Sequence, residues 1–341
     1  MLTEEEVVTE VLARHDFAAA EKFIQEVYWR SYWKGWLEMR PDVLRRFDAD
    51  HSVLSLAWQD NPALKAAKQG ETGIDAFDAW ARELVELGWL HNHARMWFAS
   101  IWIFTLRLPW QLGAGFFYAH LLDADPASNT LSWRWVAGLH TKGKHYLARA
   151  SNIRDNTLGR FDPAGQLDEG APPMTEDWAV PSPSPIPAGA RPTASRAAIL
   201  LTEEDLHPES WTLDADVTAC AVLAAPRGGD PGAPAARFSR GAVEDAAERM
   251  AAHFGVAATI ISADEIIGWT KRAGVTEIVT GYAPVGRTAQ SLDAIDIRLR
   301  SESIRLVRLQ RAWDARTWPH ARAGFFKLKE QIPRLIAAGP G

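Results

Sequence analysis

The chain has 341 residues, 47% of them hydrophobic, which is enough to build two domains with sizeable cores. Its formal net charge of −6 excludes a general electrostatic attraction to nucleic acid, although it allows a local basic face. Its single cysteine, Cys220, excludes an internal disulfide, and a reducing, cytoplasmic compartment is the simplest expectation.

The amino-terminal residues 1–6 lack the basic flank and apolar run of a secretory signal. No apolar run approaches the ~20 residues that cross a bilayer, so we expect no membrane partner. Thr3 and Glu6 have the spacing of a capping box, which predicts a helix from there through Val11. Periodicity predicts further helices over residues 18–39, 74–87 (ending at Gly88), 92–106 (stopped by Pro109) and 116–122, with another starting after residues 125–126.

The second half of the chain has a different pattern. Residues 168–194 are rich in Pro, Ser, Ala and Gly, which predicts an extended linker. Strands are then predicted over 198–201, 219–224, 258–261, 277–280 and 305–309, with helices near 240–254, 263–273 and 288–301. We therefore predict the class α + α/β: an all-helical domain over 1–167, a linker over 168–194, and a Rossmann-like parallel α/β domain over 195–338.

Tryptophan is the most unusual feature of the composition, with 16 Trp against 5 Tyr. Between residues 89 and 135 the tryptophans recur beside polar side chains that an apolar core would exclude, namely Asn92, Arg95, Asp123, Asp125 and Asn129. A buried charge is tolerated only when it is paired or bound to something polar. The combination predicts a pocket for a redox cofactor.

Three motifs carry a family resemblance. Residues 88–96 read Gly-Trp-Leu-His-Asn-His-Ala-Arg-Met, residues 122–129 read Leu-Asp-Ala-Asp-Pro-Ala-Ser-Asn, and residues 133–135 read Trp-Arg-Trp. This resembles the flavin-binding helical domain of the photolyase/cryptochrome family, with its Gly-Trp-Met-His-Asn-Arg-x-Arg-Met, Asp-x-Asp-x-x-x-Asn and Trp-Gln-Trp. Residues 200–207 and 281–287 resemble, more weakly, the family's α/β domain, which in most relatives comes first and in some holds an antenna chromophore. Whether this chain holds one, and which, stays open.

The resemblance implies FAD as the cofactor and a set of residues that bind it: Arg30, Trp89, Asn92, Arg95, Asp123, Asp125 and Asn129. Arg95 and Asp123 would form a charge pair beside the flavin, although a purely structural ion pair is the alternative. Asn129 matches the position that faces the reactive ring nitrogen, where Asn is the photolyase-like residue. In relatives, a Ser/Thr-rich segment upstream of the helix that begins here near Thr3 holds the FAD pyrophosphate, so we expect weakened affinity unless other residues substitute.

Trp58, Trp110 and Trp133 match the tryptophans along which, in the family, an electron hops from the surface to the photoexcited flavin. With Asn129 they are the predicted catalytic residues. Three independent core tryptophans are the alternative.

On the substrate side, the resemblance implies Glu26, Trp29, Asn92, Met96 and Trp135 as contacts of a pyrimidine dimer flipped out of damaged DNA, with the two tryptophans as stacking faces. Each of these tryptophans taken alone is more often a core residue. The basic run 141–149, with Arg154 and Arg160, would contact phosphates or is merely solvated. This run and His93 depart from the photolyase pattern, which has Tyr-Phe-Arg-Ile-Phe-Asn-Pro and Arg at these places.

Three functions remain open on the sequence. The first is a deoxyribodipyrimidine photo-lyase that repairs dimers, and the second is a cryptochrome-like blue-light photoreceptor without repair. The third is a flavin-free helical scaffold. His91 and His93 lie two apart and do not share a helix face, so we expect no metal site there. The oligomeric state is not predicted.

Overall fold

The computed structural model describes residues 2–224 and 233–339 and divides into two compact units. Of the described residues, 2–41, 182–224 and 238–339 belong to the first unit, and 42–181 and 233–237 belong to the second. The predicted α + α/β class is confirmed, because the second unit is helical and the first contains a parallel sheet.

The first unit is built on a five-stranded sheet whose strands all run parallel, in the order β3-β2-β1-β4-β5. The strands are β1 (Arg196–Leu201), β2 (Asp216–Leu223), β3 (Ala258–Ile261), β4 (Glu277–Gly281) and β5 (Arg305–Leu309). In the central strand, Ala198 pairs with Ala219 on one side and with Ile278 on the other. All five predicted strands are confirmed, since buried parallel strands are short apolar runs that the sequence shows directly.

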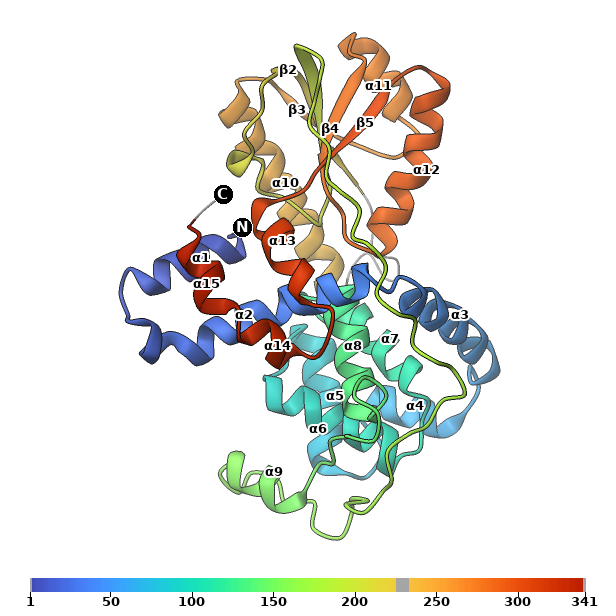
Figure 1. Ribbon diagram of the computed structural model, residues 1–341. Helices are drawn as coiled ribbons and strands as arrows, with labels where there is room; N and C mark the ends of the chain where they lie inside the picture. The colour runs from blue at the N-terminus through green and yellow to red at the C-terminus, as the bar shows by residue number, and fades with distance from the viewer. Residues whose placement is uncertain (1, 225–232, 340–341) are drawn as a thin grey trace. The chain divides into compact units, whose positions relative to one another are not determined.

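Three helices cover the two faces of this sheet: α10 (Pro234–Phe254), α11 (Ile266–Ala273) and α12 (Arg287–Ser301). Alternate residues of β1 point to opposite faces. Ile199 and Leu201 share a core with α10, while Ala198 and Leu200 share one with α11 and α12. The result is a three-layer α/β sandwich, in which α10 lies on one side of the sheet and α12 on the other (Figure 1).

The same unit contains the first two helices and the last three. They are α1 (Glu4–Leu12), α2 (Phe17–Glu38), α13 (Ala312–Thr317), α14 (Phe325–Lys329) and α15 (Ile332–Ala337), with short 3₁₀ turns at Pro208–Ser210 and Trp318–His320. The Trp313 indole donates to the Ser31 hydroxyl at 2.7 Å, and the Tyr32 hydroxyl donates to the Ala323 carbonyl at 2.9 Å. A Cβ on Gly35 would lie 2.8 Å from the Cα of Trp318, so only glycine permits this close approach.

This grouping differs from the predicted ranges, which placed residues 1–41 with the helical half of the chain. The reason is that α2 presents its aromatic side chains to helices almost 300 residues later in the sequence, and such distant partners leave no local signal. Thr3 does cap α1 through the expected reciprocal bonds with Glu6.

Buried charges fix α1 and α2 within the first unit. The Arg311 guanidinium donates to Glu4 and to Asp314, at 2.8 Å in each case. The Lys34 ammonium, whose side chain is 3% exposed, pairs with Glu204 at 3.2 Å. Burial opposes ionisation of Glu4, but the nearby cations, led by Arg311, lower its pKa to about 2. Because unpaired buried charges are costly, these pairs hold the amino-terminal helices in one arrangement.

The second unit consists of helices: α3 (Asp42–Ala57), α4 (Pro62–Gln69), α5 (Asp75–Leu87), α6 (Asn92–Ser100), a π-helix η1 (Ile101–Thr105), α7 (Trp110–His120), α8 (Pro126–Ala137) and α9 (Ala150–Asn156). The helix predicted over 92–106 is therefore present, but its last turn widens, with the Leu106 N–H bonded to the Ile101 carbonyl five residues earlier at 2.9 Å. α3, α4, α9 and the helices after residue 311 were not among the predicted elements.

The predicted linker, residues 168–194, contains no helix or strand in the structure. Its second half is nevertheless held by the first unit, since the Ser184 and Ala190 N–H groups donate to the carbonyls of Met39 and Arg308. Within the described ranges, 2–224 and 233–339, no helix combines the length and apolarity needed to cross a bilayer. Nor do the described residues include three or more His, Cys, Asp or Glu side chains grouped to hold a metal ion.

Glu277 at the start of β4 is a strongly anchored carboxylate. It accepts hydrogen bonds from the backbone N–H groups of Thr193 (2.8 Å) and Ala194 (3.0 Å), from the Thr193 hydroxyl (2.6 Å), and from Arg305 (2.8 Å). Burial alone would raise its pKa, but these donors outweigh burial and lower the pKa to about 2. The carboxylate thereby joins the end of the linker to two strands.

We expect Glu277→Gln to lower the free energy of unfolding by roughly 1–3 kcal/mol at pH 7. The pKa of Glu277 is lower in the folded state than the value of 4.5 in the unfolded state, so its ionised form stabilises the fold at pH values above 4.5. The wild-type advantage should fade as the pH falls from about 4.5 to about 2. Urea unfolding at several pH values measures this. Glu302→Gln, which removes a surface partner of Lys271, is the control. A loss of stability relative to the wild type that is the same at pH 7 and pH 3 would contradict the assignment of this stabilisation to the ionised Glu277 carboxylate.

Candidate functional site

The first two sequence motifs meet in the second unit, beside the start of α8. Gly88 ends α5 in the left-handed region, at φ 69°, as predicted for a C-cap. Its carbonyl accepts the N–H of Leu122 at 2.9 Å. A Cβ on Gly88 would lie 2.7 Å from Cγ of Leu122, so both the backbone angle and the space require glycine here.

Arg95 and Asp123 form the predicted charge pair. Both terminal nitrogens of the guanidinium donate to the carboxylate, at 3.3 and 3.2 Å, and Nε donates to the Leu90 carbonyl at 2.9 Å. The Asp123 side chain is 57% exposed, so the pair adds little to stability. Its bidentate geometry instead fixes the direction of a guanidinium at the edge of the site.

Asp125 and Asn129 lie on the first turn of α8, and both side chains bond to backbone groups. Asp125 is buried and caps the helix by accepting the Ser128 N–H at 2.7 Å, with Pro126 in the first helical turn. The Asn129 amide nitrogen donates to the carbonyl of Ala114 on α7 at 2.8 Å. This bond sets the orientation of the amide.

A buried aromatic wall adjoins these polar groups. The Trp133 ring contacts Trp102 and Phe117, with ring centroids 6.2 and 5.1 Å apart. Gly113 makes room for it, because a Cβ there would lie 2.3 Å from Cη2 of Trp133. Within the part of the chain that the structure describes, the buried Trp133 N–H has no hydrogen-bond partner.

The other two predicted electron carriers belong to the same core. Trp110 is buried and packs on Phe47, with ring centroids 5.5 Å apart. The Arg134 guanidinium lies 5.8 Å from the centroid of the Trp110 ring. Trp58 follows α3 and is half-buried against this core. Burial therefore decreases from Trp133 and Trp110 to Trp58.

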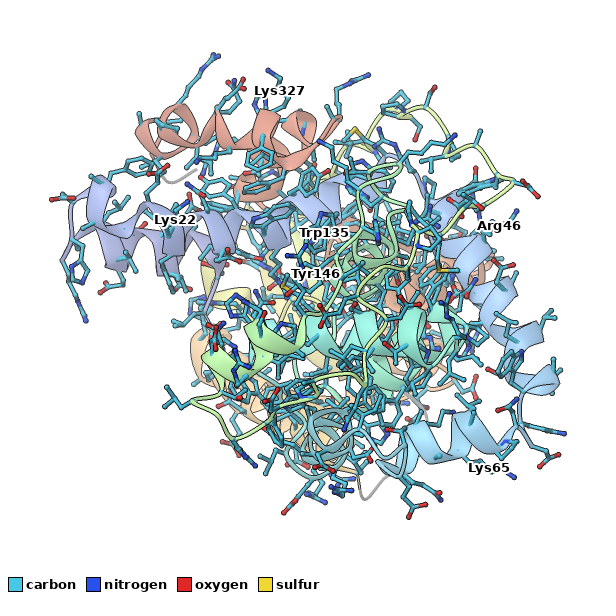
Figure 2. The ribbon with its side chains drawn as sticks, turned by 90° about the horizontal axis from the view of Figure 1, so that it is seen from below. Lys22, Arg46, Lys65, Trp135, Tyr146 and Lys327 are labelled. Carbon is cyan, nitrogen blue, oxygen red and sulfur yellow. The ribbon has the colours of Figure 1, made fainter. Side chains whose placement is uncertain are left out.

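Among the predicted substrate contacts in this unit, Trp135 is half-buried and stacks on Tyr146, with centroids 6.0 Å apart and planes 24° apart. Figure 2 shows these two side chains next to each other. Met96 is half-buried, Asn92 is exposed at the start of α6, and Trp89 is 51% exposed. The last two lie at the surface and do not belong to the buried part of the site.

The remaining predicted residues, Glu26, Trp29 and Arg30, lie on α2 in the first unit. Glu26 is exposed, and Arg30 pairs with Glu4 at 3.1 Å. One face of Trp29 is covered by Phe325 of α14, with centroids 3.7 Å apart and planes 11° apart. A ring that we expected to receive a base is thus already stacked on one side.

Sequence reasoning missed three components of the site: the Ala114 carbonyl that holds Asn129, the Tyr146 ring that stacks on Trp135, and Trp102 beside Trp133. A backbone carbonyl has no sequence signal. Tyr146 falls in the run that departs from the family pattern, and Trp102 sits in an apolar stretch where nothing distinguishes it from its neighbours.

Comparison with known proteins places these motifs in a larger match. Residues 23–167 match the family described as the FAD binding domain of DNA photolyase. The deoxyribodipyrimidine photo-lyase of Alkalihalophilus pseudofirmus is 34% identical over 154 residues, covering 45% of this chain and 32% of that protein. That of Escherichia coli is 32% identical over 132 residues (38% and 28%), and Cryptochrome-1 of Arabidopsis thaliana is 36% identical over 107 residues (31% and 15%). The chain spans about a third of the length of the photo-lyases that it matches.

We expect Asp125→Ala to destabilise the start of α8 by about 0.5–2 kcal/mol, because it removes the side-chain acceptor of the Ser128 N–H. Asp125→Asn should retain most of the stability, since Asn is an equally good cap. Amide hydrogen exchange of residues 127–130 measures the local effect. Asp16→Ala, which removes the exposed cap of α2, is the matched control and should leave α8 unchanged. Full protection of α8 in Asp125→Ala would disprove the capping role.

Proposed function

We propose that this chain is an FAD flavoprotein which opens cyclobutane pyrimidine dimers in DNA by light-driven electron transfer. The reason is that the chain belongs, through residues 23–167, to the photolyase/cryptochrome family. The observation that carries the proposal is the arrangement at the start of α8. This helix carries the capping carboxylate of Asp125, the oriented amide of Asn129 and the buried Trp133, and the Arg95–Asp123 pair lies just before its cap.

The residues present fit a flavin. A flavin ring needs hydrogen-bonding groups along its polar edge and an apolar wall beside the rest. Arg95, Asp125 and Asn129 supply the polar groups and would hold FAD together with Asp123. When bound, FAD supplies the ring that absorbs light and, in its reduced form, the electron that splits the dimer.

Asn129 would influence the charge state that the site tolerates, because its side chain carries no charge. A neutral amide carries no charge and is a very weak acid, so it tolerates negative charge nearby, where a carboxylate would repel it. Its orientation does not depend on the ligand, because the bond to the Ala114 carbonyl holds it. We propose that this residue keeps the site suited to a reduced, anionic ring.

Trp58, Trp110 and Trp133 would carry electrons inward. Trp58 is half-buried and can be reduced again by a donor in solution, whereas Trp133 and Trp110 are shielded from water. Trp135 would stack on a flipped base with the face opposite Tyr146. Flipping costs a few kcal/mol and stacking on an aromatic ring returns about 1–3 kcal/mol per base, so an ordered platform matters.

A photoreceptor without repair is the second candidate, and one observation favours it. Phe325 lies parallel to Trp29 at 3.7 Å and fills a face that a flipped base would use. A protein that only undergoes photoreduction would have no need of that face.

Dimer repair separates these functions. We expect the FAD-loaded chain, once reduced and illuminated, to remove thymine dimers from single-stranded DNA. Trp135→Ala should slow repair by roughly 5- to 150-fold, because 1–3 kcal/mol of stacking is lost. Trp269→Phe, a change in the core beside α11, is the control.

Undiminished dimers in a chain that binds FAD and undergoes photoreduction would support the photoreceptor. A purified chain that stays colourless after FAD is added would support the scaffold.

Photoreduction tests the electron route. Trp110→Phe should abolish lasting light-driven reduction of bound FAD while FAD stays bound, because phenylalanine does not donate an electron under these conditions. Absorption spectra taken before and after blue illumination report both quantities. Trp80→Phe, which alters a buried tryptophan stacked on Trp97, is the control. Photoreduction at the wild-type rate in Trp110→Phe would remove Trp110 from the route.

A further inference from the structure

We propose that Trp102 is a second electron donor to Trp133, which makes a side branch to the route through Trp110. The inference rests on the proposed function for the event that first oxidises Trp133. The branch itself depends only on contacts within the second unit.

The two indoles are in direct contact in the core. Their ring centroids are 6.2 Å apart with planes at 87°, and both side chains are almost fully buried. They meet over Gly113, where an added Cβ would lie 2.5 Å from Cζ3 of Trp133 and 2.9 Å from Cε2 of Trp102. A glycine at this point of α7 therefore allows the two rings to approach one another.

The π-helical turn η1 places Trp102 at this contact. An α-helix that widens to i→i+5 bonding is rare and is often found at functional sites. The turn is followed by a bond from the Leu108 N–H to the Trp102 carbonyl at 3.1 Å, and the Trp102 indole N–H donates to the Pro109 carbonyl at 2.9 Å.

Hydrogen bonding sets the direction of electron transfer between the pair. An N–H that donates to a carbonyl oxygen stabilises positive charge on its ring, because the bond strengthens when the donor is charged. Trp102 has such an acceptor, whereas the buried N–H of Trp133 has none among the described residues. A positive charge formed on Trp133 is therefore more stable on Trp102.

Trp110, the competing donor, has a less favourable environment for positive charge. The Arg134 guanidinium lies 5.8 Å from its ring centroid and repels such a charge, although the ion pair with Glu176 reduces this effect. The geometry thus favours sharing of the charge between Trp110 and Trp102.

The step balances as a single electron transfer. One electron leaves the Trp102 ring and reduces the oxidised Trp133, so Trp133 becomes neutral and Trp102 becomes a radical cation. No bond breaks, and the indole proton stays on nitrogen because the Pro109 carbonyl is too weak a base to remove it.

The neighbouring rings favour retention of the charge on Trp102. Among the described residues, Phe77, Phe98 and Phe116 also contact this ring, with centroids 6.4, 5.9 and 6.2 Å away. Phenylalanine is much harder to oxidise than tryptophan. Trp102 would therefore store the charge for a time and return it to Trp133.

Flash photolysis of the FAD-loaded full chain tests the branch with the outward route blocked. Trp110→Phe should retain a protonated indole radical that is detected by transient absorption and electron paramagnetic resonance. The double variant Trp110→Phe/Trp102→Phe should lose the long-lived part of this signal, because a charge that stays on Trp133 recombines quickly. Trp110→Phe/Trp97→Phe, which removes another buried tryptophan, should keep it. A radical that persists without Trp102 would overturn the proposal.

A second experiment needs no flavin and so separates failure of this inference from failure of the proposed function. The full chain is oxidised by a photoexcited ruthenium complex, and oxidised tryptophans are located by peptide mass spectrometry. Trp102 should be oxidised despite its burial, and this should be lost in Trp133→Phe and also in Trp110→Phe, which blocks entry of charge from Trp58. Trp318, which is equally buried, should stay unmodified in every sample. No oxidation at Trp102, or oxidation that survives both substitutions, would overturn the branch.

Discussion

The first turn of α8 is the constraint on which the candidate site depends. Asp125 caps this helix and Asn129 reaches back from it to α7, so both side chains owe their positions to backbone bonds within the protein. The same helix carries Trp133 into the core and Trp135 toward Tyr146. The polar side chains of Asp125 and Asn129 and the rings of Trp133 and Trp135 are thus all carried by α8. A shift of the first turn of this helix would displace them together.

Glycines determine how closely the surrounding elements approach this helix. Gly88 allows the turn after α5 to bond to Leu122, just before the α8 cap, and Gly113 allows α7 to accommodate two indoles. Position 88 requires glycine because of its positive φ as well as the lack of space for a Cβ, whereas position 113 requires glycine only because of the lack of space. The site is therefore preorganised by packing, which agrees with an electron-transfer role in which little should move.

Sequence patterns predicted what is local. Each strand is a short apolar run, Thr3 and Glu6 have a spacing that specifies a helix start, and Gly88 marks a helix end, so these features were predicted correctly. The Arg95–Asp123 pair followed from a motif resemblance, and the structure contains it. The stacking of Trp29 on Phe325 and the contact of Trp102 with Trp133 were not predicted, because both depend on which distant segments pack together.

The family match begins inside α2, a helix that belongs to the first unit. The matched region begins at residue 23, inside this helix, and ends at residue 167. A fragment cut at those limits would retain Lys34 and Glu38 but lose Glu204 and Tyr282, to which they bond. The fragment would therefore lose the ion pair and hydrogen bond that join this part of α2 to the rest of the first unit. The limits of the family match therefore cut through α2 and do not coincide with the limits of either compact unit.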